Sequence, residues 1–62
     1  MGKISVNDKV EVISRFNPDL YGEIGVVIDM KTGTHGSEAR VRFDTGYETW
    51  IDIEDLSIFL EL

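Results

Sequence analysis

The stretch YGEIGVVIDM at residues 21–30 decides the fold, because two glycines three positions apart lead into an apolar, β-rich run. Apolar residues at every second position predict a strand with one apolar face. That face consists of Ile24, Val26, Ile28 and Met30. Val27 gives the second face some apolar character, as in an interior strand of a curved sheet. Gly25 is expected where another backbone comes close or the sheet bends sharply, so the stretch predicts the central strand of a small barrel.

The length and charge of the chain limit its fold and its partners. We expect a single domain over residues 1–62, with a compact core and modest stability. Twelve acidic and six basic residues give a net charge of −6. This charge disfavours non-specific attraction to phosphates or anionic lipid and favours encounter with a basic partner. The sequence has no cysteine, which excludes disulfides and thiolate metal sites.

The sequence does not predict a membrane segment. Residues 1–6 lack the apolar core of a signal peptide, and no apolar run approaches the roughly 20 residues of a membrane span. We therefore expect a soluble, cytoplasmic protein with no membrane partner.

Two segments flank the central strand. Residues 9–14, KVEVIS, predict the first strand, with Val10 and Val12 directed inward. Residues 31–38, KTGTHGSE, contain no apolar side chain and predict a flexible hairpin connection. The one histidine of the chain, His35, lies in this connection.

The loop at residues 15–22, RFNPDLYG, carries a strong turn signal in Asn-Pro-Asp. Two aromatic residues and a leucine are unusual in a purely solvated connection. They either fold back as a lid over one end of the barrel or form an exposed recognition loop. We favour Phe16 and Leu20 as the lid, with Tyr21 partly exposed.

A second hairpin is predicted together with its register. Alternation over residues 39–43 places Ala39, Val41 and Phe43 inward and the two arginines outward. A three-residue turn, Asp44-Thr45-Gly46, follows, because glycine suits its left-handed position. The resulting pairs are Phe43 with Tyr47, Arg42 with Glu48, Val41 with Thr49, and Arg40 with Trp50. A two-residue turn would instead place the Glu48 carboxylate on the core face, which is costly.

This register sends Tyr47, Thr49 and Ile51 inward. It leaves Trp50 outward beside Arg40, where a cation–π contact is expected. Residues 52–56, DIEDL, predict a single helical turn with acidic residues in its first positions. Residues 57–62 predict the last strand. Its faces carry Leu56, Ile58, Leu60 and Leu62 on one side and Phe59 on the other.

Five strands, with a long loop after the first and a helical turn before the last, make the chain resemble the small five-stranded SH3-like barrel. The likeness covers about residues 7–60. Within it, GEIGVV at residues 22–27 followed by RVRF at residues 40–43 is similar to the KOW pattern of transcription-elongation and ribosomal proteins. The same stretch, taken with Arg15, is similar to the photosystem I reaction-centre subunit IV family, which shares the barrel. The resemblance implies an all-β fold.

The residue types needed for catalysis or for a cofactor do not occur at suitable spacings. A loop flanked by glycines cannot hold His35 as a base beside a nucleophile. Asp52, Glu54 and Asp55 lack the spacing of a calcium loop and are expected to cap the helical turn. The glycines at 22 and 25 precede a strand rather than the helix that a phosphate loop needs. We expect a non-enzymatic protein without a metal or cofactor.

The candidate binding site is an aromatic surface. Its expected residues are Phe16, Tyr21, Arg40, Glu48, Trp50 and Asp52. An outward Trp50 with charged neighbours is a candidate hot spot, and the alternative is that it covers the barrel end or packs under the first loop. Together the three aromatic residues would form one patch with an acidic rim, suited to a basic or proline-containing peptide.

Three functions remain open from the sequence. We expect a small module that binds another protein through residues 15–22 and the face around Trp50, as a monomer or a weak dimer. The alternative is a KOW-like nucleic-acid or ribonucleoprotein-associated module. Its basic residues would be Lys9, Arg15, Arg40 and Arg42. A third possibility is an acidic decoy that occupies the basic groove of a nucleic-acid-binding protein.

Overall fold

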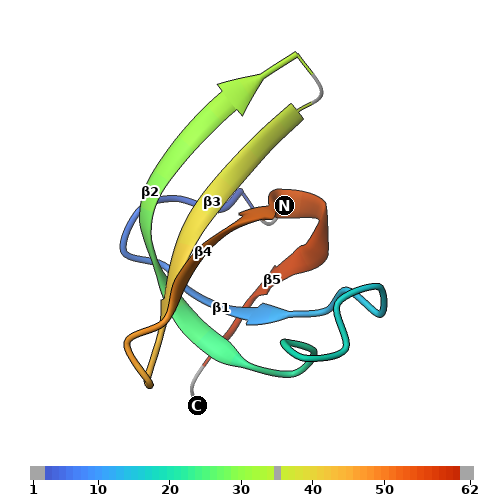
Figure 1. Cartoon of the computed structure of the whole chain (residues 1–62). Helices are drawn as coiled ribbons and strands as arrows, with labels where there is room; N and C mark the ends of the chain where they lie inside the picture. The colour runs from blue at the N-terminus through green and yellow to red at the C-terminus, as the bar shows by residue number, and fades with distance from the viewer. Residues whose placement is uncertain (1–2, 35, 61–62) are drawn as a thin grey trace.

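A computed structural model describes residues 3–34 and 36–60, which form one curved antiparallel sheet of five strands (Figure 1). The strands are β1 (Lys9–Val12), β2 (Ile24–Gly33), β3 (Gly36–Phe43), β4 (Glu48–Asp52) and β5 (Leu56–Ile58). A single 3₁₀ turn, η1 (Ile53–Asp55), precedes β5, and the strand order across the sheet is β4-β3-β2-β1-β5. The predicted all-β fold with a helical turn before the last strand is confirmed.

The core lies on the inner face of this sheet. Its buried members are Ile4, Val10, Val12, Val27, Ala39, Val41, Phe43, Ile51 and Leu56. The inward directions predicted for β1 and β3 are confirmed, because both strands bury alternate residues. In β3 the intervening Arg40 and Arg42 are exposed. Small β-branched residues dominate this interior, as expected for a sheet that must bend tightly.

The face of β2 that was predicted to be apolar and inward is wrong in its first half. Gly25 and Val27 are buried, whereas Val26 is 39% exposed and Ile24 is only half-buried. Gly25 sets this orientation because β3 crosses very close to it. A Cβ atom at this position would lie 2.6 Å from both the Arg42 carbonyl oxygen and the Val41 Cγ1 atom. Only glycine permits this crossing, so the inward face of β2 begins with glycine instead of Ile24.

A β-bulge reverses the facing of β2 at its middle. Val27 pairs with Val41, but Asp29 pairs with Arg40, so Ile28 is an extra residue in the ladder. The bulge bends the strand and moves even-numbered residues to the inner side. Met30 consequently packs against the core, as predicted, while Ile28 remains half-buried at the bend.

The predicted flexible connection at residues 31–38 is also wrong, because most of it continues the ladder. Lys31 pairs with Glu38, Thr32 with Ser37, and Gly33 with Gly36. Polar side chains are compatible with these positions because the hairpin extends beyond the core (Figure 1). His35 lies outside the described residues.

The β3–β4 hairpin has the predicted register and the predicted three-residue turn. Phe43 N–H donates to the Tyr47 carbonyl at 2.9 Å, and Gly46 adopts a positive φ of 90°. The inward direction predicted for Tyr47 is wrong, since this side chain is 56% exposed. Its ring stacks against Phe43 at the end of the barrel, with centroids 6.3 Å apart, and the core does not extend far enough to cover it.

The C-terminal part of the chain is only partly as predicted. Asp52 caps η1 by accepting a hydrogen bond from Glu54 N–H at 3.1 Å. Strand β5 ends at Ile58, and Leu60 is 76% exposed instead of lying on an inner face. Beyond Ile58 the pairing continues through one bond, from Phe59 N–H to the Lys9 carbonyl at 2.9 Å, and Lys9 is the first residue of β1. Leu62 lies outside the described residues.

Candidate functional site

The loop between β1 and β2, residues 13–23, is called the first loop. Phe16 at its bend is 98% exposed, so the prediction that it forms a lid is wrong. Leu20 does pack against the core, and it ties the loop to the barrel. Tyr21 is 54% exposed, in agreement with its predicted partial exposure.

Hydrogen bonds within the first loop explain why Phe16 is directed outward. The buried Ser14 hydroxyl accepts from Phe16 N–H at 3.3 Å, which turns the main chain at this point. Further along, Leu20 and Tyr21 N–H both donate to the Asn17 carbonyl at 3.0 Å. These bonds close the turn that the Asn-Pro-Asp sequence predicted. The loop is therefore a folded structure that holds Phe16 in water.

A shallow hollow of about 350 Å³ lies on the same loop and is lined by Arg15, Pro18 and Tyr21. Aromatic, aliphatic and cationic groups thus meet beside the exposed Phe16. The first loop combines an uncovered aromatic side chain with a neighbouring depression. This combination is typical of a protein-binding surface.

Trp50 lies in different surroundings, on the outer face of the β2–β3–β4 sheet. It is half-buried, and the Lys31 Nζ atom lies 4.5 Å from its ring centroid. The predicted partner, Arg40, is opposite Trp50 in the ladder, but its guanidinium bonds the Glu48 carboxylate at 2.9 Å. The predicted Arg40 cation–π contact is therefore replaced by one from Lys31, which approaches from β2 across β3.

Glu48 joins both outward arginines of β3. Its two carboxylate oxygens accept from Arg40 at 2.9 Å and from Arg42 at 2.8 Å. The hydrogen bond from Arg42 is the main cause that lowers the pKa of the Glu48 carboxyl below its usual range, with the charges of both arginines adding to it. Two of the four cations proposed for phosphate binding, Arg40 and Arg42, are thus already engaged with a carboxylate on this face.

The structure does not form the single aromatic patch that the sequence predicted. Phe16 and Tyr21 lie on the first loop, whereas Trp50 contacts Lys31 near the β2–β3 hairpin. Figure 1 shows that loop at the lower right and the hairpin at the top. Among the described residues, the one aromatic ring pair is Phe43 with Tyr47. Two separate surfaces replace the predicted one.

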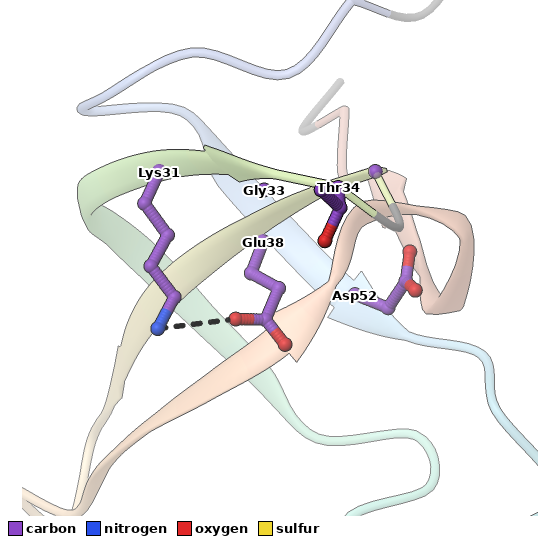
Figure 2. Close-up of a pocket in the computed structure, with 6 residues that line it drawn as sticks. Lys31, Gly33, Thr34, Glu38 and Asp52 are labelled. Carbon is purple, nitrogen blue, oxygen red and sulfur yellow. Dashed lines mark ion pairs between the residues drawn. The ribbon is translucent and has the colours of Figure 1, made fainter.

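A second hollow, of about 210 Å³, lies between the hairpin and the end of β4. Figure 2 shows Lys31 and Glu38 on one side of it, with Nζ and Oε1 3.3 Å apart, and Asp52 on the other. Lys31 thus bridges the Glu38 carboxylate and the Trp50 ring. The composition of residues 31–38 predicts a flexible connection and therefore gives no sign of this arrangement.

Few other features of the described residues bear on chemistry. Residues 3–34 and 36–60 contain no group of three or more His, Asp or Glu side chains placed to hold a metal ion. No helix within these ranges has the length and apolar character needed to cross a membrane. Lys9, the remaining strand cation, places its Nζ atom 5.6 Å from the Phe59 ring centroid.

Comparison with solved structures gives a clear likeness in fold. The chain is similar to a cyanobacterial cytochrome b6f complex subunit, PetP, with a TM-score of 0.75 and 20% sequence identity over 92% of this chain and 81% of that one. This likeness supports the predicted SH3-like barrel. Neither a scan against protein-family models nor a search of curated proteins finds a match.

The comparison also bears on the other sequence-based expectations. The structurally similar protein is a small subunit of the cytochrome b6f complex, which contradicts the expected cytoplasmic location, and we withdraw that assignment. That assignment depended only on a missing signal peptide and membrane span, which do not show what a protein binds. The similarities to the KOW pattern and to the photosystem I subunit receive no support.

Proposed function

We propose that this chain is a small, non-enzymatic binding module that attaches to another protein through its first loop. The observation that carries the proposal is the 98% exposure of Phe16 on a loop whose main chain is hydrogen-bonded in place. Exposing a large aromatic ring to water is unfavourable, and a partner that covers it recovers the apolar area. The likeness in fold to a subunit of a larger complex supports the same interpretation.

The structure of the first loop suits a preformed anchor. Ordering a loop on binding costs free energy, and a loop that is already folded avoids most of that cost. Leu20 holds one side of the first loop on the core, and Ile13 N–H donates to the Asp55 carbonyl at 2.8 Å on the other. The net charge of −6 favours a partner with a basic surface around an apolar pocket for Phe16.

The test is site-specific photo-crosslinking in cells that produce the protein. A photoreactive aromatic residue at position 16 is expected to form an adduct with one protein species. The same residue at position 45, in the exposed β3–β4 turn, serves as the matched control and is expected to form no such adduct. Equal adducts from both positions would contradict the proposal.

Quantitative co-purification gives a second measure of the same contact. Phe16→Ala is expected to reduce recovery of the crosslinked partner by about 30-fold, as for the loss of a central aromatic anchor. Thermal unfolding of this variant should match that of the unsubstituted protein, because Phe16 is outside the core. Unchanged recovery, or a large loss of stability, would overturn the assignment of Phe16 as the anchor.

A further inference from the structure

The outer edge of β4 is a second surface that the first loop does not involve. Strand β4 is the last in the order β4-β3-β2-β1-β5, and its ladder joins it to β3. An edge strand presents main-chain N–H and C=O groups that another strand can pair with. Such edges are commonly blocked by charged side chains, above all lysine, by proline or by a bulge. The sequence of β4, ETWID, contains neither lysine nor proline, and the carboxylate of Glu48 is drawn back over β3.

The hydrogen-bond pattern shows which groups point outward at this edge. Phe43 N–H donates to the Tyr47 carbonyl, and bonded pairs in an antiparallel ladder recur at every second residue. Thr49 and Ile51 therefore direct their main-chain groups toward β3. Glu48 and Trp50 direct their N–H and C=O groups away from it, toward the open edge.

The side chains of these two residues leave the edge accessible. The Glu48 carboxylate is held over β3 by Arg40 and Arg42, and the Trp50 ring extends toward Lys31 on β2. Both side chains are thus drawn back across the sheet. Within residues 3–34 and 36–60, no main-chain hydrogen bond outside the β3–β4 ladder involves Glu48 or Trp50.

We infer that the β4 edge binds an extended segment of a different polypeptide, which adds a strand beside Glu48 and Trp50. The segment pairs with the main chain of β4 and continues the sheet. Its outward residues are basic, because the exposed carboxylate of Asp52 lies at the end of β4 on a molecule with a net charge of −6, whereas the Glu48 carboxylate is already paired with Arg40 and Arg42. Its inward residues are apolar and extend the row that Thr49 and Ile51 begin.

A second copy of this chain is a poorer occupant. In a two-fold antiparallel pairing centred on Trp50, Glu48 of each copy would stand opposite Asp52 of the other. Like charges directly opposite each other on a sheet are destabilising. The acidic residues at both ends of β4 therefore select against self-association, which leaves a basic partner strand as the occupant.

The inference is tested with the blocked peptide Lys-Val-Lys-Val-Lys-Val, added to the whole protein. Binding is expected in the range of about 100 μM to 1 mM, because only a few main-chain bonds form. In amide NMR spectra the Glu48 and Trp50 N–H groups should shift and exchange about tenfold more slowly. Those of Thr49 and Ile51, already bonded to β3, should change little.

Two peptide controls separate strand addition from simple charge attraction. The same peptide with N-methyl groups at alternate positions keeps its charge but lacks the pairing donors, and it is expected not to bind. A version with glutamate in place of lysine is also expected not to bind. Equal binding of the N-methylated peptide would overturn the inference.

Two substitutions at one position provide a matched test on the protein side. Trp50→Ala retains the main-chain N–H and should keep binding within about threefold, whereas Trp50→Pro removes this N–H and should weaken binding about tenfold or more. Proline is tolerated at the outward positions of edge strands, and circular dichroism checks the fold of each variant. If Trp50→Pro does not fold, the N-methylated peptide remains decisive. The inference would be overturned if the protein formed a dimer without peptide, as measured by sedimentation, and this dimer protected the Trp50 N–H from exchange.

Discussion

The first loop and the outer face of β2–β4 both carry aromatic side chains, but these side chains differ in how far they are exposed to solvent. On the first loop, Phe16 is 98% exposed and its main chain is fixed by local hydrogen bonds. On the outer face, Trp50 is half-buried, with a lysine ammonium 4.5 Å from its ring centroid. The first loop leaves its aromatic side chain exposed, whereas Lys31 covers the aromatic ring on the sheet.

This difference shows that the type of a residue does not reveal whether it is available for binding. Tryptophan is a commoner hot spot at protein interfaces than phenylalanine, but here Lys31 covers the ring of Trp50. Availability depends on which strands pair beside the residue and which long side chains reach it. Each of the following substitutions tests one part of that comparison.

The largest effect is expected at Gly25, which lies between the two regions, at the start of β2. Gly25→Ala places a Cβ 2.6 Å from the Arg42 carbonyl oxygen and forces β2 away from β3. The free energy of unfolding should fall by about 1–3 kcal/mol, measured by urea denaturation. Gly33→Ala is the matched control, because its nearest atom would be 3.8 Å away, and a change within about 0.5 kcal/mol is expected. Equal losses for both variants would contradict the close crossing.

A smaller effect is expected at Leu20, which ties the first loop to the core. Leu20→Ala should lower the free energy of unfolding by about 1–2 kcal/mol, because part of a half-buried leucine is lost. Amide exchange should accelerate at Tyr21 and Glu23, whose bonds keep the first loop folded. Phe16→Ala should change neither quantity. A loop that exchanges equally fast in both variants would show that Leu20 does not hold it.

The smallest effect is expected at Glu48, on the outer face of β2–β4, and it is a dependence of the free energy of unfolding on pH. The Glu48 pKa is lowered from 4.5 in the folded protein, so the carboxylate adds stability above the unfolded-state pKa. This contribution is lost as the pH falls from about 4.5 through the lower folded-state value. Glu48→Gln should therefore have a lower urea midpoint than the unsubstituted protein at pH 7, and the gap should narrow at pH 3. Adding 1 M salt at pH 7 should also narrow it.

Much of the fold could be predicted because local patterns and the tertiary structure agree. Alternation in residues 39–43 and the cost of burying Glu48 were sufficient to fix the turn and its register. Asp52 caps η1 as its position predicts. For the turn, the competing register would have placed the Glu48 carboxylate in the core, and so the sequence alone excluded it.

The rest could not be predicted because it depends on how strands cross. Alternation in β2 gave the wrong face because Gly25 counts as neither apolar nor polar, and a bulge at Ile28 then changes the phase. The polar residues 31–38 resemble a loop in composition, although the ladder holds them as strand. The contact that holds Trp50 away from the first loop could not be predicted for the same reason, because Lys31 belongs to this extended hairpin.

The folding of the first loop upon itself has a consequence for how this protein can evolve. Its scaffold depends on the side chains of Ser14 and Leu20, whereas those of Arg15 and Phe16 support neither contact. Selection can therefore replace Arg15 and Phe16 to meet a changed partner while the stability of the barrel is retained. Among descendants of one ancestor, the two sets should drift at different speeds.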